Sequence, residues 1–222
     1  MPPMSAAPAA VPFDAALVET WITGWTMARE TPPPRRVPGG FRVEVGWPDQ
    51  RARIVFPAVE GVAAAAAAID EPWVWLKVCA PADAVRPLLP ARWSIDRIGF
   101  LMERPPAPFG ASSPPRAYQL ALEARASLVI AEVRHADGAV AASGRVALLG
   151  AHAVYDRIAT EASHRRRGLG RAVMAALGRA AEARGCTRGL LVGTPDGRAL
   201  YQALGWRLLG DYTSAVIRPA GE

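Results

Sequence analysis

The sequence contains few cysteines and no long apolar run. Its 222 residues include two cysteines, Cys79 and Cys186, which lie far apart and lack the spacing of metal ligands. This pattern argues against a disulfide framework or a zinc site, and we interpret both as buried small apolar residues. No segment approaches the roughly 20 apolar residues of a membrane span, because the alanine run at 63–68 is short and soon meets an acid. We therefore expect no metal and no membrane partner.

The first twelve residues also lack the basic start and apolar block of a secretion signal. We expect residues 1–12 to form a disordered or extended tail. The protein is accordingly predicted to be cytoplasmic.

Lysine is almost absent although the chain is basic. The net charge is +6, and Lys77 is the only lysine among 26 basic residues. The arginines are spread along the chain except at Arg165, Arg166 and Arg167, and no nucleic-acid motif accompanies them. A polyanionic small molecule is therefore favoured over nucleic acid as the partner.

Two segments rich in proline and glycine, 31–40 and 103–117, divide the chain. We expect an N-terminal α/β block at 13–104, a linker at 105–117 and a second domain at 118–222. Apolar residues at helical spacing predict a helix over 13–29. The rest of the block is predicted as alternating strands and helices, with strands at 41–47, 73–80 and 93–102 and helices in the alanine-rich segment and at 81–89. No sequence repeat joins this block to the second domain.

The second domain begins with successive strand patterns. Strands are predicted at 118–124, 127–135, 139–150 and 151–160, and the Asp137-Gly138 pair predicts a hairpin between the second and third. A basic, glycine-containing loop follows, and then a helix over 170–184, a strand at 189–193, a helix at 198–204 and a strand at 206–217. This order predicts a mixed α/β sheet.

The segment HRRRGLGRAVM, residues 164–174, has three arginines and two glycines within its first seven residues, at the start of the predicted helix. A helix N-terminus carries unpaired amides and partial positive charge, and glycine lets a phosphate approach them closely. The Walker sequence is absent, and Val173 stands where a dinucleotide fingerprint requires a third glycine. The segment is therefore predicted to bind the diphosphate of a different cofactor.

Residues Arg165 to Gly170 resemble the signature of the GCN5-related N-acetyltransferase (GNAT) family, which has Arg or Gln, two residues, Gly, one residue, and Gly or Ala. The segment ALYQALGW, residues 199–206, is similar to the family helix in which Tyr is followed by Gly and an aromatic residue. The resemblance covers about 118–218 and identifies no specific member. It implies a GNAT-like, mostly antiparallel sheet flanked by helices, with the N-terminal α/β block as an addition.

This resemblance implies acetyl-CoA as the acyl donor, with an amine attacking the thioester directly. The pantetheine arm would bond to the backbone of Ile158, Ala159 and Thr160, where strand 151–160 parts from strand 189–193. The pyrophosphate would bind the loop and helix start, at Arg165, Arg166, Arg167, Gly168, Leu169, Gly170 and Arg171. Tyr201 would protonate the departing thiolate, and either His152 or Asp156 would take the amine proton.

The acceptor is expected to be a primary amine on a small molecule or a peptide, and the protein a homodimer. The sequence departs from the family at Thr194, where many members have Asn, at Gly197, and in lacking the two helices after the first strand. The N-terminal block is the candidate source of the missing acceptor side. The alternative function is a non-catalytic acyl-CoA-binding or regulatory module.

Overall fold

The computed structural model describes residues 13–219, and the predicted tail at 1–12 lies outside them. The first half contains α1 (Ala15–Arg29), β1 (Arg35–Val37), β2 (Gly40–Trp47), β3 (Gln50–Phe56), α2 (Val62–Ala68), β4 (Val74–Val78), α3 (Ala82–Val85) and β5 (Ser94–Arg104). The second half contains β6 (Tyr118–Ala124), β7 (Leu128–His135), β8 (Val140–Leu149), β9 (His152–Thr160), α4 (Leu169–Glu182), β10 (Arg188–Gly193), α5 (Pro195–Ala203) and β11 (Arg207–Val216).

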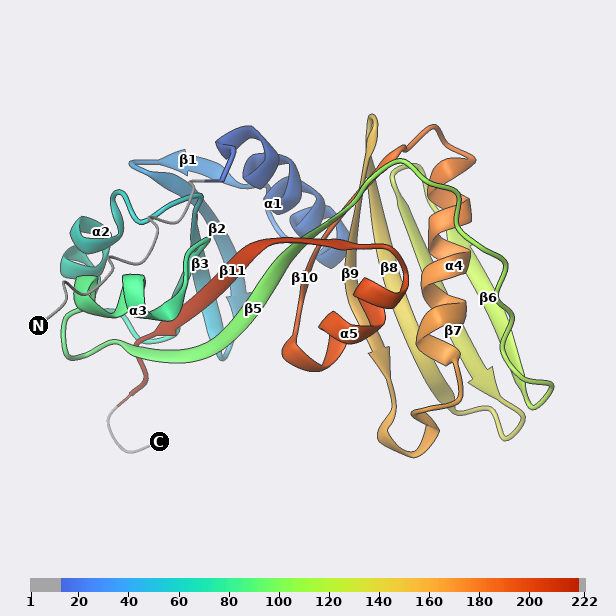
Figure 1. The fold of residues 1–222 in the computed structure, drawn as a ribbon. Coiled ribbons are helices and arrows are strands. Elements are labelled where there is room, and N and C mark those ends of the chain that lie inside the picture. Colours follow the sequence, from blue (N-terminus) through green and yellow to red (C-terminus); the bar gives the residue numbers. More distant parts are fainter. Residues whose placement is uncertain (1–12, 220–222) are drawn as a thin grey trace, which may run out of the picture.

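These strands form one sheet of 11 strands in the order β1-β2-β3-β4-β11-β5-β10-β9-β8-β7-β6 (Figure 1). The pairs β3–β4 and β9–β10 are parallel, and the other neighbours are antiparallel. The prediction of a mixed, mostly antiparallel sheet flanked by helices, with an N-terminal α/β block, is confirmed.

The two longest helices cover opposite faces of the sheet at β9. Ala153 and Tyr155 pack in the cluster that contains Val173 of α4, whereas Val154 packs in the cluster that contains Ile22 of α1. Successive side chains of a strand point to opposite faces, so this alternation requires a layer on each side. The centre of β9 is buried on both faces as a result.

The two halves of the chain repeat one order of elements. Each has an antiparallel hairpin, a helix, a strand parallel to the one before it, a short helix and a long strand, namely β2-β3-α2-β4-α3-β5 and β8-β9-α4-β10-α5-β11. The last strands are exchanged, because β5 pairs with β10 while β11 pairs with β4. The two exchanged strands also pair with each other. The sequence analysis missed this repeat, because the two halves share an order of elements without an evident sequence repeat.

The predicted helices and strands are present, with shifts of a few residues at their ends. Two strands were not predicted. One is β3, which forms a hairpin with β2, and the other is β1, which lies in the segment 31–40 rich in proline and glycine. It is an edge strand that pairs with β2, and prolines flank it rather than interrupt it. The segment 105–117 contains no helix or strand, and the sheet is continuous across the two halves that it connects.

Within residues 13–219, no helix is long and apolar enough to cross a bilayer. The same residues contain no cluster of three or more His, Cys, Asp or Glu side chains suited to a metal ion. Cys79 and Cys186 are buried and free, and burial raises the pKa of the Cys79 thiol to about 12.

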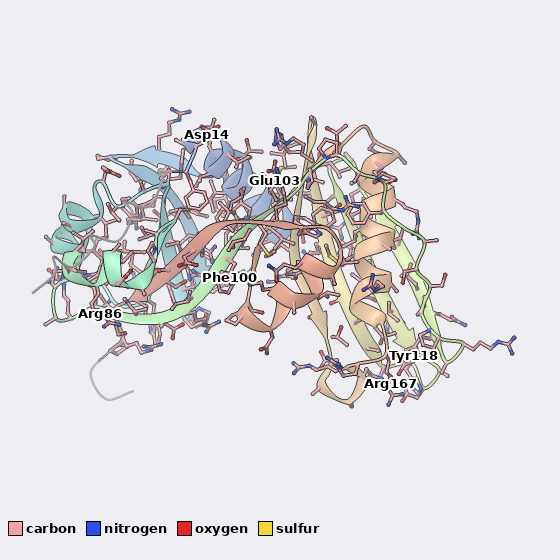
Figure 2. The ribbon with its side chains drawn as sticks, in the orientation of Figure 1. Asp14, Arg86, Phe100, Glu103, Tyr118 and Arg167 are labelled. Atoms are coloured by element: carbon pink, nitrogen blue, oxygen red, sulfur yellow. The ribbon has the colours of Figure 1, made fainter. Side chains whose placement is uncertain are left out.

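A buried carboxylate joins the three central strands. Glu103 of β5 is 3% exposed and accepts hydrogen bonds from Arg188 of β10 and from Arg207 of β11, the latter at 3.0 Å. Figure 2 shows Glu103 among the central strands. Both arginines are partly exposed, so water solvates their charges. The buried carboxylate of Glu103 has little water around it and is stabilised by the two arginines instead. Glu103 therefore ties the exchanged strand to its neighbours.

Glu103→Gln is expected to lower the free energy of unfolding by about 1.5–3 kcal/mol, since hydrogen bonds to a charged group are lost. The matched control is Glu132→Gln, which breaks the more exposed pair with Arg134 and is expected to cost less than about 1 kcal/mol. Urea unfolding of both variants measures the difference. Equal losses would show that the central ion pairs contribute no more than a surface pair.

Candidate active site

Strands β9 and β10 begin as a parallel pair and then separate. They are paired at Arg188↔His152, Gly189↔Ala153 and Leu190↔Val154. Beyond this point β10 stays paired with β5, and β9 stays paired with β8 as far as Thr160. The edge of β9 that faces β10 therefore has no partner strand after Val154. The predicted pantetheine-binding residues Ile158, Ala159 and Thr160 lie on this part of β9.

The predicted diphosphate loop leads from the end of β9 to the start of α4. Gly168 is the N-cap in the left-handed region, with φ 77°, and no side chain caps the helix. The first-turn amides, starting at Leu169, consequently have no partner within the helix. A Cβ at Gly170 would lie 3.2 Å from Cδ2 of Leu200, so this helix start is closely packed against α5. The geometry suits an anion bound at the helix end.

Arginines surround this helix start. Figure 2 shows Arg167 at the end of the molecule where α4 begins. Arg165 donates to the backbone oxygen of Thr160 at 3.3 Å, and Arg166 has a positive φ of 62°. The arginines at 165–167 are exposed, whereas Arg171 follows on the first turn of α4. They add positive charge to an already favourable helix end.

Tyr201 lies on α5, beside the last residues of β10. It is 7% exposed, and its ring centroid lies 6.1 Å from that of Trp206. Burial and the nearby charge of Asp156 raise the pKa of Tyr201 to about 12. Its phenol therefore keeps its proton at neutral pH, as a general acid must. Thr194 caps this helix by accepting a hydrogen bond from the amide of Gly197 at 3.1 Å.

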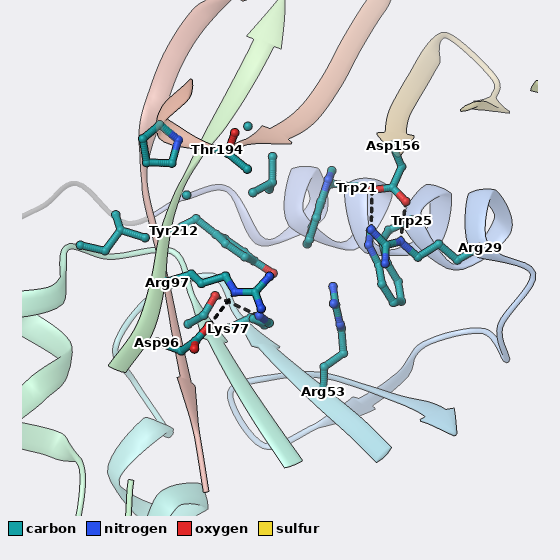
Figure 3. A pocket seen from close by; sticks show the side chains of 16 residues that line it. Trp21, Trp25, Arg29, Arg53, Lys77, Asp96, Arg97, Asp156, Thr194 and Tyr212 are labelled. Carbon is teal, nitrogen blue, oxygen red and sulfur yellow. Dashed lines mark hydrogen bonds and ion pairs between the residues drawn. The ribbon is translucent and has the colours of Figure 1, made fainter. Parts of the chain in front are cut away.

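A cavity of about 480 Å³ lies next to the separating strands. Its walls come from both halves of the chain, with α1, β3, β4 and β5 contributed by the first half and β9, β10 and β11 by the second (Figure 3). Gly193 and Thr194 at the end of β10 line it, as do Trp21 and Trp25 of α1. The N-terminal block thus supplies much of the cavity wall.

Asp156 points into this cavity and is engaged by an arginine. Arg29 of α1 binds both carboxylate oxygens, with Nη2 3.1 Å from Oδ1 (Figure 3). The guanidinium also lies over the rings of Trp25 and Trp47, at 4.8 and 5.3 Å from their centroids. The pair places one negative and one positive group beside the opening.

His152 and Asp156 were the two candidates for the base, and the structure does not bring them together. His152 begins β9, and four residues of strand correspond to about 13 Å. Asp156 lines the cavity, whereas His152 does not. Of the two, only Asp156 is placed to face an acceptor in the cavity.

Most cavity residues were not singled out as site residues by the sequence analysis, among them Arg53, Lys77 and Tyr212. Arg53 and Lys77 are charged residues on β3 and β4, yet only 7% and 8% of their surfaces are exposed. No motif marks them. The one available signal was that Lys77 is the only lysine of the sequence and stands in an apolar strand.

Residues 124–208 match the family model described as an acetyltransferase (GNAT) domain. The fold is similar to a GCN5-related N-acetyltransferase from Kribbella flavida, with a TM-score of 0.65 and 17% identity over 95% of this chain and 98% of the other. A putative GNAT acetyltransferase from Novosphingobium aromaticivorans is similar with a TM-score of 0.58 and 16% identity, over 91% of this chain and 99% of the other. A tandem GNAT protein from the clavulanic acid biosynthesis pathway is similar with a TM-score of 0.50 and 17% identity, over 66% of this chain and 65% of the other. No curated protein matches the sequence.

The position of α1 against β9 can be tested at Gly24. A Cβ there would overlap the side chain of Val154, so Gly24→Ala is expected to displace the helix and destabilise the protein by about 1–3 kcal/mol. Helix propensity alone predicts the opposite effect, an increase of about 1 kcal/mol in the free energy of unfolding. Urea unfolding decides between them, and a gain in stability would contradict close packing of α1 on β9.

Proposed function

We propose that the chain, whose residues 124–208 match the GNAT acetyltransferase domain model, is an acetyltransferase of this family and transfers an acetyl group from acetyl-CoA to a primary amine bound in the cavity between its two halves. The observation that carries this proposal is the separation of β9 from β10 after Val154, beside both the uncapped start of α4 and the cavity. These features support the proposal because a donor bound at β9 and α4 and an acceptor bound in the cavity would meet at one opening.

The donor would be held by backbone groups. The free edge of β9 at 158–160 would offer amides and carbonyls to the pantetheine arm, and the amides from Leu169 onward would bind the diphosphate. Arg165, Arg166, Arg167 and Arg171 add charge without contacting the thioester. Binding of the donor therefore depends on backbone geometry at the glycines more than on any one side chain.

The reaction requires a neutral amine, because its nitrogen lone pair attacks the thioester carbon. The nitrogen loses a proton, the C–S bond breaks, and the thiolate takes up a proton. Tyr201 is the proposed donor of that second proton, since its phenol is protonated and lies near Asp156. Asp156 is the proposed acceptor of the first, directly or through water, and Arg29 holds its carboxylate in place.

Acetyl-CoA is expected to raise the Tm of the protein, by the equivalent of about 2.7 kcal/mol at a hundredfold excess over Kd. Gly170→Glu should abolish this shift, because the side chain collides with Leu200 and its charge repels the diphosphate. Gly170→Ala, which adds a small neutral group, serves as the control. Thermal unfolding with and without acetyl-CoA gives the comparison, and an undiminished shift in Gly170→Glu would contradict the donor site.

Tyr201→Phe is expected to lower kcat by about 10²- to 10⁴-fold while the KM for acetyl-CoA changes little, because only the proton donor is removed. The matched control is Tyr155→Phe, which removes a buried phenol from the same apolar cluster; neither tyrosine lines the cavity. Release of free thiol in the presence of an amine panel measures both. Equal kcat values for wild type and Tyr201→Phe would make Tyr201 a packing residue, and no thiol release with any amine would favour a binding module.

A further inference from the structure

Two basic side chains at the base of the cavity, Arg53 and Lys77, form no ion pair with an acid among residues 13–219. Arg53 lies 3.6 Å from the ring of Trp25 and donates from Nη2 to Oε1 of Gln50 at 3.0 Å. Its Nε is buried and makes no hydrogen bond to the described residues. Burial lowers the pKa of Arg53 to about 10, so the guanidinium stays charged at neutral pH.

Lys77 is the second of these basic residues. Its Nζ donates to Oγ of Ser214 at 2.9 Å and lies 4.1 Å from the ring centroid of Trp75. Burial, and then repulsion by Arg53 and Arg97, holds the pKa of Lys77 well below its usual value. An anion beside Lys77 would favour its charged form again.

A neutral donor completes the group. The hydroxyl of Tyr212, on β11, is buried and has no hydrogen-bond partner within residues 13–219. Burial raises the pKa of Tyr212 above its usual value, so the phenol keeps its proton. Arg53, Lys77 and Tyr212 all line the cavity, as Figure 3 shows.

The cavity carboxylates are engaged elsewhere. Asp156 is bound by Arg29 through two hydrogen bonds. Asp96 is bound by Arg97 and by Arg218. Neither forms an ion pair with Arg53 or Lys77, so the base of the cavity keeps an excess of positive charge.

A buried charge without a counterion opposes folding, and a buried donor without an acceptor adds to the cost. Such groups concentrate at functional sites. Here the unused Nε of Arg53, the ammonium of Lys77 and the hydroxyl of Tyr212 are all donors. The complementary ligand group is an oxyanion, which accepts several charge-assisted hydrogen bonds at once.

We propose that the acceptor is a small amine that also carries an oxyanion, a carboxylate or a phosphate, held by Arg53, Lys77 and Tyr212 while its amino group faces the opening between β9 and β10. This inference rests on the proposed transferase function. A cavity of about 480 Å³ suits a molecule of amino-acid size rather than a folded protein surface. Trp21 and Trp25 would pack against its apolar part.

Matched amines test the proposal. A series of ω-amino carboxylates of increasing chain length is compared with the corresponding ω-aminoalkyl phosphates and ω-amino alcohols. The Tm is measured without acetyl-CoA and at constant ionic strength, so that binding is detected independently of acyl transfer. We expect at least one anionic series to raise the Tm and the alcohols to have no effect. The series that acts identifies the oxyanion.

Arg53→Met should remove this shift and weaken binding of the acting probe by about tenfold or more, because a charge-assisted contact is lost. The matched control is Arg51→Met, the same change two residues earlier on β3 at an exposed side chain outside the cavity, and it should retain the shift. Lys77→Met provides a second variant of the site if Arg53→Met does not fold.

The outcomes separate the two proposals. The oxyanion subsite would be overturned if neither anionic series raised the Tm. It would also be overturned if the rise in Tm persisted in both Arg53→Met and Lys77→Met. Thiol release from acetyl-CoA is measured separately on the same amines. If the anionic probes bind through Arg53 and no amine releases thiol, the transferase function fails although the oxyanion subsite is present. Preferred acetylation of the anionic amines supports both.

Discussion

Strand β5 leaves the N-terminal half and runs between β10 and β11, and the arrangement of the whole sheet depends on this exchange. Without β5, strand β10 would lose its antiparallel partner and β11 would lose the longer of its two pairings. Glu103 holds the exchanged strand through Arg188 and Arg207, at a point where the carboxylate is cut off from water. The cavity is a consequence of the same exchange, because β5 and β11 bring residues of the two halves to one place.

The two halves have the same order of helices and strands, but the parallel strands separate in only one of them. Strands β3 and β4 pair over five positions, from Ala52↔Val74 to Phe56↔Val78, whereas β9 and β10 pair over three and then separate. The helix between the strands also differs, since α2 has 7 residues and α4 has 14. The closed half contributes side chains to the cavity instead, above all Arg53 and Lys77 from its parallel pair. One half thus carries the expected donor site and the other the charged base of the cavity.

Electrostatics in the cavity fall into two kinds. The pairs Arg29–Asp156 and Arg97–Asp96 are balanced, and each can be held in place without a ligand. Arg53 and Lys77 are not balanced among the described residues, and their burial opposes folding. Natural proteins tolerate such costs where they serve function. A ligand oxyanion would supply the missing counterion, which links acceptor binding to stability.

The sequence alone determined the local features. Hydrophobic periodicity located the helices and all strands but β1 and β3, and the arginines and glycines of 164–170 predicted the loop and helix that the family match covers. It could not determine which strands pair. The exchange of β5 and β11 and the meeting of Arg53, Lys77 and Asp156 in one cavity were decided by the tertiary structure, and the separation of β9 from β10 was implied by the family resemblance alone. The physical reason is range: turn chemistry and periodicity act over a few residues, whereas strand pairing depends on burial and backbone hydrogen bonds between segments more than a hundred residues apart.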